Sequence, residues 1–268
     1  MCVEREKNIS ETVVKHSIKL IALSMAVAMC QPCNVRAQSA GSFVATLGGA
    51  WLDFPTSGSG PMVSSSAFGT FTSPGVNATI HNTFTPSLQF TYFVTDHVAV
   101  EVFTSVPPKL EVSSTGSVTP VGAGGPSLSL ANLHPVLSVR AWAPIVLAKY
   151  YFGGAESRVR PFVGVGMNYT WFRSVQLNPG FSGPLGQAAG PGGSIQTSIS
   201  PSWNPVLTGG ASYQFNKHWS LMGSVTWFPL KTNASFNAVS ANGHIVLSNK
   251  TRMSAEPLFL NIGVGYKF

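Results

Sequence analysis

The chain has 268 residues and a formal net charge of +7, yet only 9% of its residues are charged. Soluble domains carry about 25% charged residues, so the composition argues against a surface that faces water throughout. The Lys and Arg residues form no run and no base-stacking motif accompanies them. We therefore expect no nucleic acid among the partners of this protein.

Residues 1–37 are predicted to be a cleaved signal peptide. The apolar run 20–29 follows Lys15 and Lys19, and it has the length of a signal-peptide core, which is too short to span a bilayer. Small residues ending at Ala37 fit a cleavage site, which leaves residues 38–268 as one domain. All three cysteines precede this site, so no disulfide is expected in the mature chain.

Beyond this leader, apolar residues recur with period two. In the segment "SLQFTYFV", Leu88, Phe90 and Tyr92 share one face, whereas Gln89 and Thr91 lie on the other. Such alternation predicts a strand with one apolar and one polar face. Eight segments of this kind are predicted to be strands, in chain order 42–54, 79–94, 97–112, 141–152, 160–173, 204–215, 218–232 and 257–268.

The connections between these strands alternate in length. The short ones are 95–96, 153–159 and 216–217. The long ones are rich in Gly, Ser, Pro and Asn and cover 55–78, 113–140, 174–203 and 233–256. Short turns at one end and long loops at the other are typical of an outer-membrane barrel, whose strands cross the hydrocarbon with about 9–11 residues.

The composition of the two faces indicates which one points outward. The polar faces consist mainly of Gly, Ser, Thr and Asn, and the apolar faces end in aromatic residues such as Trp171, Trp219 and Tyr266. Aromatic residues of this kind form belts at membrane interfaces. We therefore predict an all-β fold, an eight-stranded antiparallel transmembrane β-barrel in a bacterial outer membrane, with its apolar face toward lipid. Phe268 would end the strand that closes the barrel and removes its exposed edge.

A set of polar residues is predicted to face the interior of this barrel. The set comprises Gln89, Glu101, Lys149, Asn168, Gln214, Asn261 and Lys267. An eight-stranded barrel has room for side chains or for one small ligand. Two interpretations stay open, a selective polar constriction or a buried plug of ion pairs and hydrogen bonds. The plug is favoured because a charge at low dielectric needs a partner.

Three prolines interrupt neighbouring predicted strands, Pro107 and Pro108 in the third and Pro144 in the fourth. Proline cannot donate to a β-ladder, so a lateral gap between these strands is one interpretation. The other is that both strands have already left the bilayer there. Nearby apolar residues are candidates for an apolar pocket, although ordinary packing at the rim is the favoured interpretation for any single one: Phe54, Phe103, Leu110, Trp142 and Phe172.

The sequence gives little support to catalysis. Five histidines follow the leader, but serine is so abundant that a Ser–His pair carries almost no signal. No His, Cys, Asp and Glu cluster has the spacing of a metal site. The pair Gly164 and Gly166 lies inside a predicted strand with no helix after it, so it is not a phosphate loop. We expect no enzyme, no metal and no cofactor.

Three stretches carry a resemblance to a known family: "FTYFVTDHVAVEVFTSVPPKLEV" (90–112), "LAKYYFGGAESRVRPFVGVGMNYTWF" (147–172) and "LFLNIGVGYKF" (258–268). In these stretches the chain resembles the outer membrane protein W (OmpW/AlkL) family. The resemblance implies an eight-stranded barrel that passes small hydrophobic molecules from an apolar pocket to a lateral opening. One departure is Thr46, at a place where the family often has Arg.

These observations together predict passive uptake of small hydrophobic solutes with lateral release into the membrane. The expected partners are membrane lipid, such solutes, and the barrel-assembly machinery, which would contact the last strand ending at Phe268. The alternative function is a structural or surface-interaction barrel with a plugged lumen, whose loops contact host, phage or bacteriocin.

Overall fold

The computed structural model describes residues 39–268 except 74, 120–124 and 126. Contacts divide the chain into Met1–Val35 and Arg36–Phe268, and all described residues belong to the second unit. The predicted signal peptide lies outside the described residues, so both the signal peptide and its cleavage site stay predictions.

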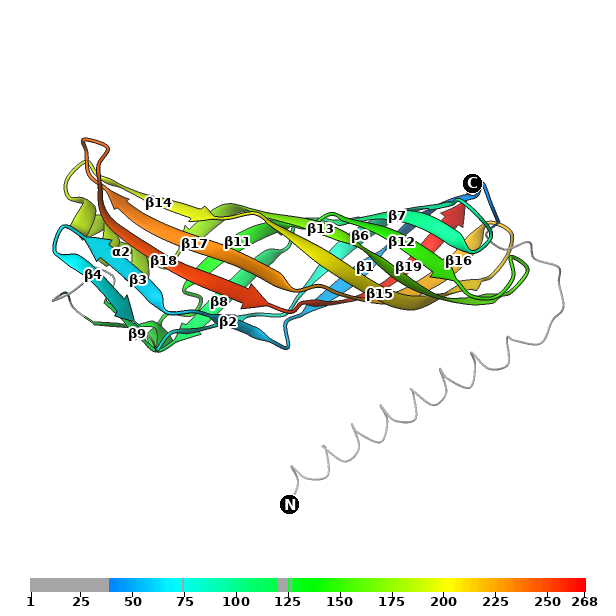
Figure 1. The fold of residues 1–268 in the computed structure, drawn as a ribbon, viewed down its shortest axis with the longest axis horizontal. Coiled ribbons are helices and arrows are strands. Elements are labelled where there is room, and N and C mark those ends of the chain that lie inside the picture. The colour runs from blue at the N-terminus through cyan, green and yellow to red at the C-terminus, as the bar shows by residue number, and fades with distance from the viewer. Residues whose placement is uncertain (1–38, 74, 120–124, 126) are drawn as a thin grey trace, which may run out of the picture. The chain divides into compact units, whose positions relative to one another are not determined.

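Eight antiparallel strands of the described chain form a closed barrel (Figure 1). They are β1 (Phe43–Asp53), β6 (Thr83–Phe93), β7 (Val98–Ser105), β12 (Ile145–Tyr151), β13 (Val159–Leu177), β15 (Ser202–Gln214), β16 (Trp219–Trp227) and β19 (Leu258–Lys267). Their order around the barrel is β12-β7-β6-β1-β19-β16-β15-β13, and the pairing of β13 with β12 closes the ring. The predicted fold class is confirmed.

The alternation of side chains along these strands decides what each face contacts. Leu47, Val165 and Ile262 on the outer face are 68%, 58% and 62% exposed, and their polar neighbours along each strand point inward. Gly166 belongs to the inward set, where a Cβ would collide with the carbonyl oxygen of Val146 on β12. Glycine here allows β12 and β13 to pair closely. The apolar-outward arrangement predicted from the sequence is thus what the strands adopt.

The short turns join strands where the sequence places them, at 94–97, 152–158 and 215–218. They lie at the same end of the barrel as the C-terminal residue (Figure 1). The long connections extend from the opposite end, which we call the long-hairpin end.

The long connections contain further strands, which were not expected from the sequence. These strands are β2 (Ser57–Ser59), β3 (Met62–Ser66), β4 (Gly69–Ser73), β5 (Asn77–Ile80), β8 (Lys109–Thr115), β9 (Ser117–Val118), β10 (Leu128–Ser129), β11 (Leu137–Trp142), β14 (Ser194–Ile199), β17 (Leu230–Val239) and β18 (Ile245–Ala255). Their Ser, Asn and Gly content gives little local strand preference. Their pairing comes from hairpin partners instead.

Beyond the closed barrel these strands form two separate ladders. One has the order β14-β17-β18-β3-β4, with β2 added to β18, and the other joins β5, β8 and β11 to the far half of β13. A small two-stranded sheet, β9 with β10, precedes the 3-10 turn η1 (Leu130–Asn132).

Prolines separate the barrel strands from their extensions at nearly every crossing. Breaks occur at Pro55, at Pro107 and Pro108, at Pro144, at Pro201, at Pro229 and at Pro257. Three of the predicted strands, 97–112, 141–152 and 218–232, are therefore each two strands. The prediction 79–94 is also split, at residues 81 and 82. Proline ends a ladder because it has no N–H to donate.

Helix α2 (Pro179–Ala189) was not expected from the sequence. Asn178 caps it by accepting a hydrogen bond from the Gly180 N–H at 2.9 Å, and Gly190 ends it with φ of 75°. Phe181, Leu185 and Ala189, spaced four residues apart, are buried. They join the apolar core between the two ladders. Among the described residues, no helix has the length and apolar character required to cross a membrane.

Candidate functional site

The predicted inward-facing polar residues lie inside the closed barrel. Six of them are buried, namely Gln89, Glu101, Lys149, Asn168, Gln214 and Asn261. Lys267 is half-buried at the short-turn end, where its carbonyl oxygen lies 3.1 Å from Nδ1 of His218. The alternation of the strands therefore places each of these residues as predicted, although the placement alone assigns none of them a role in transport.

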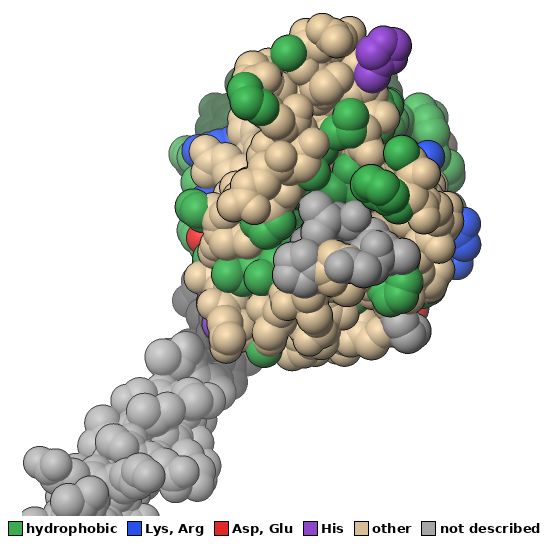
Figure 2. Space-filling view, turned by 90° about the vertical axis from the view of Figure 1, so that its left-hand side faces the viewer, with side chains coloured by type: hydrophobic (Ala, Val, Ile, Leu, Met, Phe, Trp, Pro, Cys, Tyr) green, Lys and Arg blue, Asp and Glu red, His purple; other side chains and the backbone are tan. Residues whose placement is uncertain are grey.

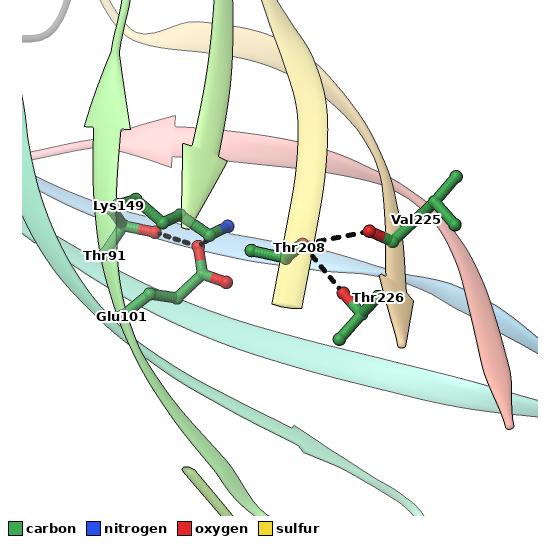
Figure 3. Close-up of polar contacts among 6 residues, drawn as sticks. All are labelled: Thr91, Glu101, Lys149, Thr208, Val225 and Thr226. Carbon is green, nitrogen blue, oxygen red and sulfur yellow. Dashed lines mark hydrogen bonds and ion pairs between the residues drawn. The ribbon is translucent and has the colours of Figure 1, made fainter. Parts of the chain in front are cut away.

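The centre of this polar interior is an ion pair. Lys149 Nζ on β12 lies 2.6 Å from Glu101 Oε2 on β7, and the two side chains are 1% and 2% exposed. Thr91 Oγ1 on β6 donates to the same carboxylate oxygen at 2.8 Å (Figure 3). Lys149 also lies over the ring of Phe162, 4.3 Å from its centroid. A paired and hydrogen-bonded charge is stable inside a barrel. The geometry favours the plug over an open constriction.

Further hydrogen bonds extend this polar layer across the barrel. Thr208 and Thr226 join β15 to β16 through hydroxyls 2.8 Å apart (Figure 3). Ser87 donates to the Asn261 side chain at 2.6 Å. A solute that crossed this layer would have to break such bonds.

Arg160 is an interior residue that sequence reasoning missed. Its guanidinium lies 5.6 Å from the ring of Phe93 and 5.2 Å from that of Tyr151, and it donates to the carbonyl oxygen of Asp96. Strand alternation could have identified Arg160, because it lies two residues from the inward-facing Phe162 and therefore points to the same side of the strand. Together these groups fill the barrel toward the short-turn end.

An apolar cavity lies at the level of the prolines, on the other side of the polar layer. Its lining includes four predicted residues, Phe54, Pro108, Leu110 and Phe172. Phe103, also predicted, is buried with its ring 6.2 Å from that of Phe259, which lines the cavity too. The cavity measures about 20 Å³, room for little more than one water. A hydrophobic solute would therefore enter only if side chains move.

A second apolar cavity lies farther toward the long-hairpin end. It measures about 30 Å³ and its lining includes Ile80, Val139 and Met253 as well as Leu110 and Phe172. Leu110, Phe172 and Leu230 line both cavities. The apolar interior therefore extends from the long-hairpin half of the molecule down to the polar layer.

The backbone ladder between β7 and β12 stops at the predicted gap. Phe103 pairs with Ile145, and pairing resumes only at Lys109 with Arg140, on the extensions β8 and β11. The residues between these two pairs are 104–108 on one strand and 141–144 on the other. We call this interruption the seam. Within it, one backbone hydrogen bond crosses, from the Ala141 N–H to the Pro108 carbonyl at 3.2 Å.

The three predicted prolines all belong to the seam. Their carbonyl oxygens accept hydrogen bonds, from the Arg140 side chain to Pro107 at 3.3 Å and from the Asn168 side chain to Pro144 at 3.1 Å. The cavity at the proline level is lined by Ser105 and Pro108 from one side of the seam and by Ala141 and Ala143 from the other. The seam therefore forms one part of the wall of this cavity.

The expectation that Trp142 lines the apolar pocket is wrong. Its side chain is 40% exposed on the outer face, and its ring stacks on Trp171 at 5.7 Å. Ala141 beside it is buried and lines the cavity instead. Strand alternation explains the error, since adjacent residues point to opposite faces.

Two histidines meet one serine on the outer surface of the extension. Ser113 Oγ lies 2.8 Å from His81 Nε2 and 3.4 Å from His134 Nδ1. Within the part of the chain that the structure describes, no carboxylate hydrogen-bonds to either imidazole, and no group of three or more His, Cys, Asp or Glu could hold a metal ion. The geometry lacks the third group that orients a catalytic base.

Comparison with known proteins identifies the family. The model of the OmpW family matches residues 57–268. The chain belongs to the OmpW family. It is 29% identical to outer membrane protein W of Escherichia coli strain K12, over 93% of this chain and 99% of the relative. The resemblance carried by the three sequence stretches is thereby confirmed.

This member of the OmpW family is also similar to a second named relative and to a solved structure. It is 26% identical to the dibenzothiophene metabolism operon protein PahQ of Pseudomonas aeruginosa, over 73% of this chain and 76% of that protein. Its fold resembles the outer membrane protein OprG of Pseudomonas aeruginosa, with a TM-score of 0.67, 24% identity and coverage of 87% of this chain and 99% of OprG. This OmpW-family protein is an outer-membrane β-barrel, and its exposed apolar face contacts lipid.

Proposed function

We propose that this OmpW-family barrel takes up small hydrophobic molecules passively and releases them sideways into the membrane through the seam. One observation carries the proposal: the apolar cavity at the proline level is lined from both sides of the seam. A solute that reaches this cavity has an apolar exit where the backbone ladder is already interrupted. No energy source is required, because transfer of an apolar molecule from water to lipid is favourable.

The polar layer favours release of the solute sideways through the seam over passage through the interior of the barrel. Below the cavity the solute would meet the pair Glu101 and Lys149 and the hydrogen bonds around it. Passage there would leave buried charges without partners, which costs several kcal/mol. Opening the seam breaks one backbone hydrogen bond, between Ala141 and Pro108, and the hydrogen bond from the Arg140 side chain to the Pro107 carbonyl.

The solute class proposed is apolar, and the name of one relative agrees with it. PahQ is named for a dibenzothiophene metabolism operon, and dibenzothiophene is an apolar aromatic compound. The lining of both cavities is largely aliphatic and aromatic, which suits solutes of this kind.

The test is uptake of a radiolabelled medium-chain alkane or fatty acid by intact cells. We expect the initial uptake rate to fall when the protein is deleted and to return when it is supplied from a plasmid, while uptake of a small polar sugar stays unchanged. Equal uptake of several apolar solutes with and without the protein would rule the proposal out.

The alternative is a barrel that serves as a scaffold for surface contacts, and one observation favours it. The interior cavities measure only about 20–30 Å³, while Phe68 at the tip of the β3–β4 hairpin is 88% exposed. Under this alternative, deletion leaves uptake unchanged and substitutions in the long hairpins alter attachment of a partner. We also propose that the barrel is not an enzyme, since the Ser113 cluster lacks an orienting carboxylate.

The last residue is proposed to be the contact for the barrel-assembly machinery. Phe268 is 72% exposed, although its ring lies 5.1 Å from Tyr266 and 5.8 Å from Phe43. Phe268→Ala is expected to lower the amount of barrel in the outer membrane severalfold, while the purified variant refolds with a stability loss of about 1 kcal/mol, the typical value of an aromatic pair.

The two effects are separated by immunoblotting outer-membrane fractions and by refolding in detergent. The matched control is Phe68→Ala, which removes another exposed aromatic side chain, at the opposite end, and should assemble normally. If Phe268→Ala assembles as well as Phe68→Ala does, the proposed contact is wrong.

A further inference from the structure

Three basic side chains lie in a row on the outer face beyond the closed barrel. Arg140 of β11 is in register with Lys109 of β8 on one side and with Arg173 of β13 on the other. All three are exposed, and we call them the basic row. Directly paired residues on adjacent antiparallel strands lie about 5 Å apart, so the three positive charges are held close together.

This arrangement is unfavourable for the isolated protein. Like charges directly opposite each other on neighbouring strands destabilise a sheet. The positive charge of Lys109 is compensated by Glu111, because Lys109 Nζ lies 3.0 Å from Glu111 Oε1. Over the described residues, neither Arg140 nor Arg173 forms an ion pair, and Arg140 Nη1 donates only to the carbonyl oxygen of Pro107 at 3.3 Å. Two adjacent guanidinium groups without a carboxylate suit an external phosphate, which Arg binds with two parallel hydrogen bonds.

Nearby aromatic side chains indicate at which level of the membrane the basic row lies. Trp142 and Trp171 are in register and stack 5.7 Å apart, two residues below Arg140 and Arg173 on the same strands. Two residues correspond to about 7 Å along a strand. Trp and Tyr mark the membrane interface, so the basic row lies at the level of lipid headgroups. It also lies on the side of the long hairpins, which outer-membrane barrels direct to the cell exterior.

The basic row differs from the other charges at this end because its three cations are cross-strand neighbours. Lys231, Lys250 and Arg252 are also exposed, but they lie apart from the row on β17 and β18, and Asp53 and Glu256 adjoin β1 and β19. Figure 2 looks onto the long-hairpin end and shows Lys and Arg side chains at its margin, away from its middle. The cations in this view therefore face sideways, where a neighbouring lipid would lie.

We propose that the basic row binds a phosphate group of one lipid A molecule in the outer leaflet, whose acyl chains pack against Trp142 and Trp171. The phosphate sits between Arg140 and Arg173 and offsets their mutual repulsion, and Lys109 borders the site. This binding goes beyond solute uptake, because it holds whether or not the seam conducts.

The test measures binding of bisphosphorylated lipid A to the refolded mature barrel in detergent, without divalent cations, by native mass spectrometry. The variant Arg140→Gln with Arg173→Gln is compared with Lys231→Gln with Lys250→Gln, which removes two exposed cations from β17 and β18 at the same end. We expect the arginine variant to bind about 30-fold more weakly, given the typical contribution of each basic side chain near an anionic lipid surface. The lysine variant should bind within about twofold of wild type.

Two further probes identify the ligand chemistry. The first probe is dephosphorylated lipid A, which should bind the wild-type protein weakly. Its affinity should match that of bisphosphorylated lipid A for the arginine variant. The second probe is inorganic phosphate, which at the same concentration should not compete with lipid A for the wild-type protein. Equal losses in both variants, no loss in either, or tight binding of either probe would overturn the proposal. Gel migration with and without heating verifies that each barrel is folded. If the double variant does not fold, Arg173→Gln alone should weaken binding about fivefold.

Discussion

Replacing Lys149 with Met is expected to lower the free energy of unfolding of the barrel by about 3–5 kcal/mol, the usual effect of removing one partner from a buried ion pair. Lys149 Nζ lies 2.6 Å from Glu101 Oε2, and both side chains are almost fully buried. In the variant the Glu101 carboxylate keeps the Thr91 hydroxyl at 2.8 Å but has no counter-charge. The measurement is equilibrium unfolding in urea after refolding into phospholipid vesicles, followed by tryptophan fluorescence.

Two companion variants separate the ion pair from general damage to the interior. Glu101→Gln combined with Lys149→Met removes both charges, so it should regain a large part of the stability lost in Lys149→Met. Thr208→Val loses the hydrogen bond to Thr226, 2.8 Å long, and should cost only about 1 kcal/mol. If Lys149→Met is no more destabilising than Thr208→Val, the pair does not hold the barrel together.

Closing the seam is expected to reduce uptake of apolar solutes to the level of a strain without the protein. The variant carries Pro107→Val, Pro108→Thr and Pro144→Val, which supply backbone N–H groups where the ladder between β7 and β12 stops. Each ladder hydrogen bond restored would stabilise the closed wall by about 1 kcal/mol. The cavity lined by Ser105 and Ala143 would then lose its exit. Initial uptake of the radiolabelled solute is the measurement.

A control variant repairs proline breaks away from the seam. Pro201→Thr with Pro229→Val affects the junctions of β14 with β15 and of β16 with β17, and neither proline lines the cavity at the proline level. This control should transport normally. Normal uptake by the triple variant, once heat-modified migration shows that it is folded, would mean that solutes do not leave through the seam.

The membrane-embedded part of the fold could be predicted because its signal is local. A strand that faces lipid on one side and a packed interior on the other must alternate at every residue. Leu47 and Ile262 outward, and Gln89 and Asn261 inward, follow from that rule alone. A gap at Pro107, Pro108 and Pro144 was one of two interpretations that the sequence allowed. Proline has no N–H to donate, yet Pro161 and Pro205 lie inside paired barrel strands, so a proline alone does not decide where a ladder ends.

The extensions beyond the barrel were less readable for a physical reason. Their strands are rich in Ser, Asn and Gly, so residue preference and alternation are weak, and hairpin partners decide the pairing. Helix α2 had an Asn178 cap, a Gly190 stop and apolar residues spaced four apart, but Pro184 inside it argues against a helix. Trp142 was a pocket candidate because it lies near Pro144, but proximity along the chain does not decide which face a strand residue occupies, and its side chain points outward.

The sequence by itself determined the class of fold, the face that meets lipid and the polar character of the interior. These properties depend on the order of residues along one strand. Only the tertiary structure decided which groups meet across strands, such as Glu101 with Lys149, 48 residues apart, or Arg140 with Arg173. Pairing of distant residues depends on the register between strands, which closure of the ring sets for all eight barrel strands together.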